Sequence, residues 1–223
     1  MYQLYYSIID FMQYLLLIPI FIGAFTFRRL NLPLKLIFYY VIFNTIITIV
    51  TRILAAYSTN NLMFINFFNI VEIFLITYVF SLIIDNKKVK LIIRISYIIF
   101  LLIIVYTFFF YQNINEYAYH LKLFESFFFI YFGATYLFNA IKKEKDIIND
   151  SFALFSIAVL MYFITTFLVF GSFKYLAKME PSLGIKVWTF NSFFNQIFFI
   201  IIAIAFYTQA KLSASEQAGK EQK

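Results

Sequence analysis

Long apolar runs and short polar breaks alternate along the chain. Each run holds about 20 mostly apolar residues, which is the length that a helix needs to cross a bilayer. Polar residues fill the breaks, as at 58–61 (STNN) and 85–88 (DNKK). The pattern predicts an all-α fold, a polytopic membrane helix bundle. Its seven transmembrane helices are expected at residues 5–27, 34–57, 62–84, 91–111, 117–141, 151–175 and 187–209.

These seven spans account for almost the whole chain, so no separate soluble domain is expected. Residues 1–210 form a seven-helix transmembrane domain in this interpretation, and residues 211–223 form a polar cytoplasmic tail. Between the last two spans, residues 176–186 contain Lys178, Glu180, Pro181 and Gly184. Because proline and glycine interrupt helices, the sequence predicts a longer loop there.

Composition strengthens the membrane assignment. Hydrophobic residues make up 63% of the 223 residues and charged residues only 13%, whereas a soluble domain carries about 25% charge. The chain has no cysteine and one histidine, His120. Disulfides, thiolate metal sites and zinc sites with several histidines are therefore excluded, and neither a metal nor a cofactor is expected.

The basic residues orient the bundle, because short cytoplasmic loops of membrane proteins are rich in lysine and arginine. Thirteen of the 18 basic residues fall on one side of the predicted topology. That side is expected to be cytoplasmic and the N-terminus outside. The net charge of +7 then reflects topology, and no nucleic acid is expected as a partner. The thirteen are Arg28, Arg29, Lys35, Lys87, Lys88, Lys90, Arg94, Lys142, Lys143, Lys145, Lys211, Lys220 and Lys223.

Polar side chains inside the predicted spans are the candidate functional residues, because ionisable groups are costly in hydrocarbon. Glu72 and Glu125 lie about 15 and 12 Å below the outer surface, at the helical rise of about 1.5 Å per residue. Asn44 and Arg52 are eight residues apart on one face of the second helix. These positions predict a polar cavity in the outer half of the bundle. Its candidate lining residues are Asp10, Asn44, Arg52, Asn66, Asn69, Glu72, His120, Lys122, Glu125, Asn191, Asn195 and Gln196.

Each of these residues also has a structural interpretation. Glu72 and Arg52 can form an ion pair between adjacent helices. Lys122 can neutralise Glu125 or extend toward the membrane interface. The asparagines can hydrogen-bond between helices, and His120 can be a surface imidazole. Another alternative brings Glu72 and Glu125 together as a carboxylate dyad that shares a proton.

Two short motifs carry a resemblance to other proteins. They are residues 69–72 (NIVE) in the third span and Glu125-Ser126 in the fifth. Together with the hydrophobic rhythm, they resemble small uncharacterised bacterial seven-helix integral membrane proteins, some of which are similar to membrane modules associated with sensor kinases. The resemblance implies a multi-pass protein of the bacterial inner (cytoplasmic) membrane with a sensing or accessory role. It implies no reaction and carries over no catalytic residue.

Two classes of function follow as hypotheses. The first is a non-enzymatic sensing or binding module, or an accessory subunit of a larger inner-membrane complex. Its cavity would hold a small or lipidic ligand or contact a partner membrane protein, while the bilayer surrounds the bundle. The alternative is a proton-coupled transporter or a lipid-acting membrane enzyme that uses Glu72 and Glu125. The short loops leave little room for a soluble active site, which favours the first class.

Overall fold

The computed structural model describes residues 14–111, 116–179 and 181–221, and these segments contain helices and no strands. The predicted all-α fold is therefore confirmed for this part of the chain. A 3₁₀ turn, Phe27–Arg29, follows the first α-helix, and a π-helical turn, Thr107–Tyr111, extends the fourth. The α-helices are α2 (Leu17–Thr26), α3 (Leu32–Ala56), α4 (Leu62–Ile83), α5 (Lys87–Tyr106), α6 (Tyr119–Lys142), α7 (Ser151–Met179) and α8 (Pro181–Glu221).

Six helices, α3 to α8, are long and apolar enough to cross a membrane. This is the arrangement of a multi-pass membrane protein. The remaining helix, α2, has 10 residues, which is too short to cross a bilayer by itself. The earlier part of the first predicted span, with Asp10, lies outside the described residues.

Short polar side chains fix where three of the helices begin. Asn31 caps α3, Asn86 caps α5 and Asp150 caps α7. In each case a side-chain oxygen accepts a hydrogen bond from a backbone N–H of the first helical turn, at 2.9 to 3.3 Å. Such a cap satisfies a donor that the helix itself leaves unpaired. The polar breaks of the sequence therefore act as helix starts as well as turns.

The loop predicted over 176–186 is wrong. Helix α7 continues to Met179 and α8 already begins at Pro181. Proline is compatible with the first position of a helix, because that residue needs no hydrogen-bonded N–H. Gly184 lies inside α8, where a glycine costs only about 1 kcal/mol relative to alanine.

Helix α8 is far longer than its apolar run. It has 41 residues, which corresponds to about 60 Å at about 1.5 Å per residue. The predicted polar tail is helical as far as Glu221. Alanine, lysine, glutamate and glutamine dominate residues 214–221, and all four are good helix formers.

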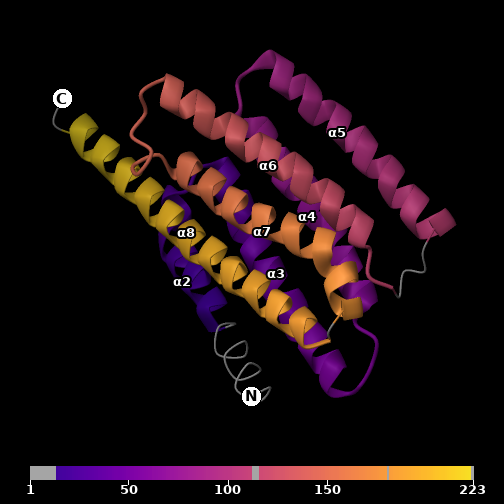
Figure 1. Ribbon diagram of the computed structural model, residues 1–223. Coiled ribbons are helices and arrows are strands. Elements are labelled where there is room, and N and C mark those ends of the chain that lie inside the picture. Colours follow the sequence, from indigo (N-terminus) through magenta and orange to yellow (C-terminus); the bar gives the residue numbers. More distant parts are fainter. Residues whose placement is uncertain (1–13, 112–115, 180, 222–223) are drawn as a thin grey trace.

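The helices form a bundle in which α7 and α8 lie side by side, while α5 occupies one edge (Figure 1). Aromatic rings fill the centre. The Phe80 ring of α4 lies 5.7 Å from Phe132 of α6 and 5.4 Å from Phe155 of α7, between ring centroids. All three side chains are buried, so the middle of the bundle is a packed apolar core.

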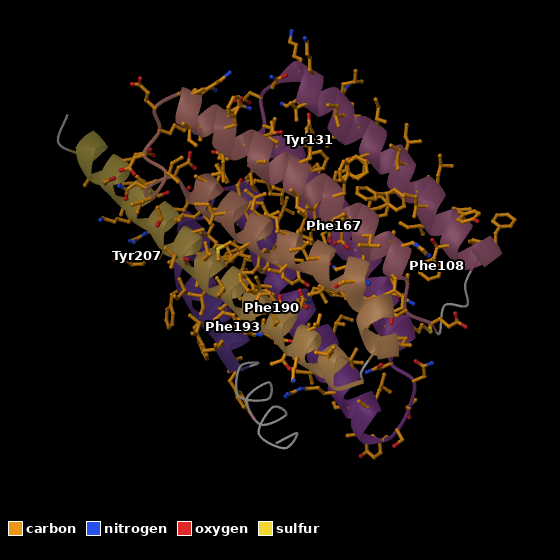
Figure 2. The ribbon with its side chains drawn as sticks, in the orientation of Figure 1. Phe108, Tyr131, Phe167, Phe190, Phe193 and Tyr207 are labelled. Atoms are coloured by element: carbon orange, nitrogen blue, oxygen red, sulfur yellow. The ribbon has the colours of Figure 1, made fainter. Side chains whose placement is uncertain are left out.

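Other aromatic side chains cover the outside of the bundle. Figure 2 labels several of them, including Phe190, Phe193 and Tyr207 on α8. These three are half or more exposed, at 54%, 50% and 63%. In water such a surface would be unfavourable, whereas in a bilayer it contacts lipid. The exposed apolar surface thus agrees with the span lengths.

The two ends of the bundle differ in charge. We call one the basic end, which holds residues 27–31, 84–86 and 143–150 and the part of α8 after residue 210. The other, the opposite end, holds the turn at 57–61 and the first turn of α6. Successive helices run in alternating directions between the two ends. The candidate polar residues of α3, α4, α6 and α8 therefore lie toward the opposite end.

Candidate functional site

A cavity of about 340 Å³ lies toward the opposite end of the bundle, among α3, α4, α6, α7 and α8. It extends from Leu62, the first residue of α4, to Lys122 one turn into α6. Amide and hydroxyl side chains from several helices line it, together with aliphatic side chains and aromatic rings. The polar lining residues are Asn44, Thr48, Thr51, Asn69, Tyr117, Lys122, Tyr162, Asn191, Ser192 and Asn195.

Lys122 joins two carboxylates beside the cavity. Its Nζ donates a hydrogen bond to Glu72 Oε2 of α4. The same Nζ lies 3.1 Å from Glu125 Oε2, three residues further along α6. Lys122, Glu72 and Glu125 are only 3%, 1% and 0% exposed. We call these three residues the buried triad.

Further groups hold the triad in place. Tyr40 of α3 donates its O–H to Glu72 Oε1 at 2.6 Å. The Lys122 ammonium also lies 5.3 Å from the ring centroid of Phe163 and 5.9 Å from that of Tyr162, distances at which a cation is attracted to a ring face. Side chains of four helices, α3, α4, α6 and α7, therefore surround the buried triad.

The triad does not balance in charge if every group is ionised. One ammonium faces two carboxylates, which leaves one negative charge in a buried place. Two carboxylates that share a buried site repel each other, and desolvation is unfavourable for both charges. Glu125 is the less supported carboxylate, since neither of its oxygens accepts a hydrogen bond with good geometry from the described residues. A single proton at this point would make the triad neutral.

Two buried amide groups near the cavity are also unsatisfied. Within the described part of the chain, Asn69 Nδ2 donates to no acceptor and Gln196 Oε1 accepts from no donor. Asn69 is 3% exposed and lines the cavity. A buried amide without a partner costs about 1–3 kcal/mol. Asn69 thus offers a hydrogen-bond donor to a molecule in the cavity.

The structure brings five of the candidate residues to the cavity wall. They come from four helices, α3, α4, α6 and α8, and Asn191 is further held by the Thr166 hydroxyl, which donates to its Oδ1 at 3.1 Å. Glu72 and Glu125 lie next to the cavity through Lys122. The five wall residues are Asn44, Asn69, Lys122, Asn191 and Asn195.

Other candidates lie elsewhere. Asn66 joins α4 to the start of α6: its Nδ2 donates to the Glu116 carbonyl at 2.7 Å and its Oδ1 accepts from the Ala118 N–H at 3.3 Å. His120 is exposed and lines a separate, mainly apolar cleft of about 530 Å³ between α5 and α6. Arg52 and Gln196 are not part of the cavity wall.

The ion pairs correct one interpretation and confirm another. The pairing of Glu72 with Arg52 is wrong, because the Glu72 oxygens bind Lys122 and Tyr40. The pairing of Lys122 with Glu125 is confirmed. Lys122 does not extend to the interface, because the two carboxylates hold it inside the bundle.

Sequence reasoning missed Tyr40 as part of the site, although a signal existed. Tyr40, Asn44 and Thr48 follow each other at intervals of four residues and so share a face of α3. The chain has 18 tyrosines, and they occur in the spans as well as near their ends. A single tyrosine inside a span therefore did not stand out as a site residue. Tyr162 was missed for the same reason.

No protein-family model, curated protein or solved structure matches this chain. The fold and the site therefore rest on the chain's own residues.

Proposed function

We propose that the protein is a non-enzymatic membrane module that binds a small polar molecule, or the polar part of a lipid, in its cavity. The observation that carries this proposal is the cavity wall, in which amides and hydroxyls from several helices converge on about 340 Å³. Ligand pockets combine such convergent polar groups with apolar surface. The aromatic rings of Phe68 and Phe170 supply the apolar part.

Binding is tested by thermal unfolding of the purified chain with a panel of sugars, amino acids and choline. Asn69→Leu and Asn195→Leu replace polar groups of the wall by apolar ones. We expect at least one compound to raise the Tm of the wild type and to lose this effect in both variants. Asn149→Leu is the matched control at the basic end and should keep the effect. If the shift persists in both cavity variants, the cavity is not the binding site.

We further propose that the chain has seven spans, with the basic end in the cytoplasm of a bacterium and the cavity open to the outside. The excess of lysine and arginine at the basic end supports this orientation. Because the chain has no cysteine, Asn195→Cys provides a single label site in the cavity, and Ser215→Cys one at the basic end. An impermeant thiol reagent added to intact cells should label the first and spare the second. The reverse result would refute the orientation.

A second candidate is a proton-coupled transporter, and the buried triad favours it. A triad that holds one proton can release it when a ligand changes the position of Lys122. Such a protein should move protons into liposomes when substrate is added, and Glu125→Gln should abolish this flux while binding persists. Binding without flux in the wild type would leave the sensing or accessory role as the better account.

A further inference from the structure

A second cleft lies at the basic end, remote from the cavity. It has a volume of about 320 Å³ and lies where α4 ends, α5 begins and α6 ends. Ile84 and Ala140 form part of its wall, and both are buried. Its rim carries Asp85, Lys143 and Lys145. The cleft therefore combines an apolar wall with charged groups at the end of three spans.

The charges on the rim are not equivalent. Lys145 donates to Asp150 Oδ2 at 2.9 Å. Burial of the Asp150 carboxyl opposes its ionisation, but the hydrogen bond from Lys145 and others from the backbone prevail and lower the pKa of Asp150 below its ordinary value. Lys145 is thus largely neutralised by its partner. Asp85 and Lys143 have no ion pair within the described residues.

The cleft therefore presents an unpaired carboxylate and an unpaired ammonium together. A purely anionic group would be repelled by Asp85, and a purely cationic group by Lys143. A group that carries both a phosphate and an ammonium can satisfy both at once. The position at the end of the spans is the depth at which phospholipid headgroups lie.

We propose that this cleft binds a phosphoethanolamine group, with the phosphate on Lys143 and the primary ammonium on Asp85. The membrane itself is the source that the position favours, since phosphatidylethanolamine would place its chains along the apolar ends of α4 and α6. A primary ammonium donates hydrogen bonds to a carboxylate, which a trimethylammonium group cannot do. The site should therefore prefer ethanolamine over choline headgroups. This inference does not depend on the proposed function of the cavity.

The test uses the full chain in detergent micelles with equal mole fractions of dioleoyl phosphatidylethanolamine, phosphatidylcholine or phosphatidylglycerol. Bound lipid is counted by native mass spectrometry. We expect the wild type to retain roughly tenfold more of the ethanolamine lipid than of the choline lipid, as one hydrogen bond to a charged group would produce. Asp85→Asn should abolish this preference, and Lys143→Gln should lower retention of both lipids.

Two matched variants serve as controls. Lys88→Gln removes a lysine outside the cleft wall, and Glu144→Gln removes an acid beside it. Both should retain lipid as the wild type does. Free phosphoethanolamine distinguishes a soluble ligand from a lipid. If millimolar phosphoethanolamine displaces the bound lipid, the site is assigned to a soluble molecule of the same chemistry. If it does not, the site is assigned to the lipid. Equal retention of the ethanolamine and choline lipids by the wild type, or stronger retention of phosphatidylglycerol, would overturn the proposal. So would an equal loss of lipid in Lys88→Gln and Lys143→Gln.

Discussion

Removing the ammonium of the buried triad should destabilise the protein more than any other lysine substitution. Lys122→Met keeps most of the side-chain volume but leaves Glu72 and Glu125 without their shared cation. Breaking a buried ion pair on one side costs about 3–5 kcal/mol, because a buried charge loses its compensation. Here one ammonium serves two carboxylates, so we expect the upper part of this range.

The remaining carboxyls should determine how much of the loss can be recovered. Glu125→Gln alone leaves one carboxylate and one ammonium, so it should be the mildest single change of the triad. The triple variant Lys122→Met, Glu72→Gln and Glu125→Gln removes all three charges together. Replacing a whole buried ion cluster by neutral groups is often close to neutral for stability. We therefore expect the triple variant to be more stable than Lys122→Met.

The free energy of unfolding is measured by titration of the detergent-solubilised chain with sodium dodecyl sulfate. Lys142→Met is the matched control on the same helix. Lys142 is exposed and its Nζ lies 4.5 Å from the Phe138 ring centroid, so its loss should cost less than about 1 kcal/mol. A cost of Lys122→Met no larger than that of Lys142→Met would refute the reasoning. So would a triple variant less stable than Lys122→Met.

Three further perturbations test other parts of the structure. Tyr40→Phe removes a hydrogen bond to a buried carboxylate and should cost about 1.5–3 kcal/mol in the same unfolding titration. Gly23→Ala places a methyl group against the Phe38 ring and should cost about 1–3 kcal/mol by overpacking, whereas Gly171→Ala meets only ordinary contacts and should be neutral or slightly stabilising. The pKa of Asp150 is lowered in the folded chain, so its contribution to the Tm should be present above its unfolded pKa of about 3.9 and be lost as the pH falls through the folded value.

Each of these three has its own check. Tyr39→Phe changes an exposed neighbour of Tyr40 and should leave stability unchanged, and an equal loss in both would show that the hydroxyl bond to Glu72 is not the cause. Equal stability of Gly23→Ala and Gly171→Ala would contradict the tight packing at Phe38. In thermal scans between pH 6 and pH 3, Asp150→Asn should reduce the acid-dependent decrease in Tm, and an unchanged decrease would exclude Asp150 as its source.

The sequence predicts most helices correctly because hydrophobic length is a property of the chain alone. Runs of about 20 apolar residues must be helical if they cross a bilayer, since hydrocarbon offers no partner for their backbone groups. Breaks are harder to predict. Pro181 indicates an interruption in sequence, but a proline can also begin a helix, and the outcome depends on what the neighbouring helices allow.

The sequence predicts how deep the site residues lie in the membrane, but it does not predict which of them form ion pairs. Counting residues from the ends of the spans places Glu72 and Glu125 at similar depths and Lys122 nearer the outer surface, and the structure brings the three together. Which basic residue faces Glu72 depends on the rotation of each helix and on its neighbours. Arg52 and Lys122 were both available, and only the packing of α4 against α6 selects Lys122.

The length of α8 has a mechanical consequence. Asn191 and Asn195 line the cavity near one end of this helix, while Gln209 bonds to Asn31 and Ser151 at the basic end. Glu216 lies 25 residues beyond Asn191, about 37 Å away at the helical rise of about 1.5 Å. A change of tilt of about 3° at Asn191 would therefore move Glu216 by about 2 Å if the helix stays straight. A straight α8 would in this way carry a small movement at the cavity to the exposed residues at the basic end.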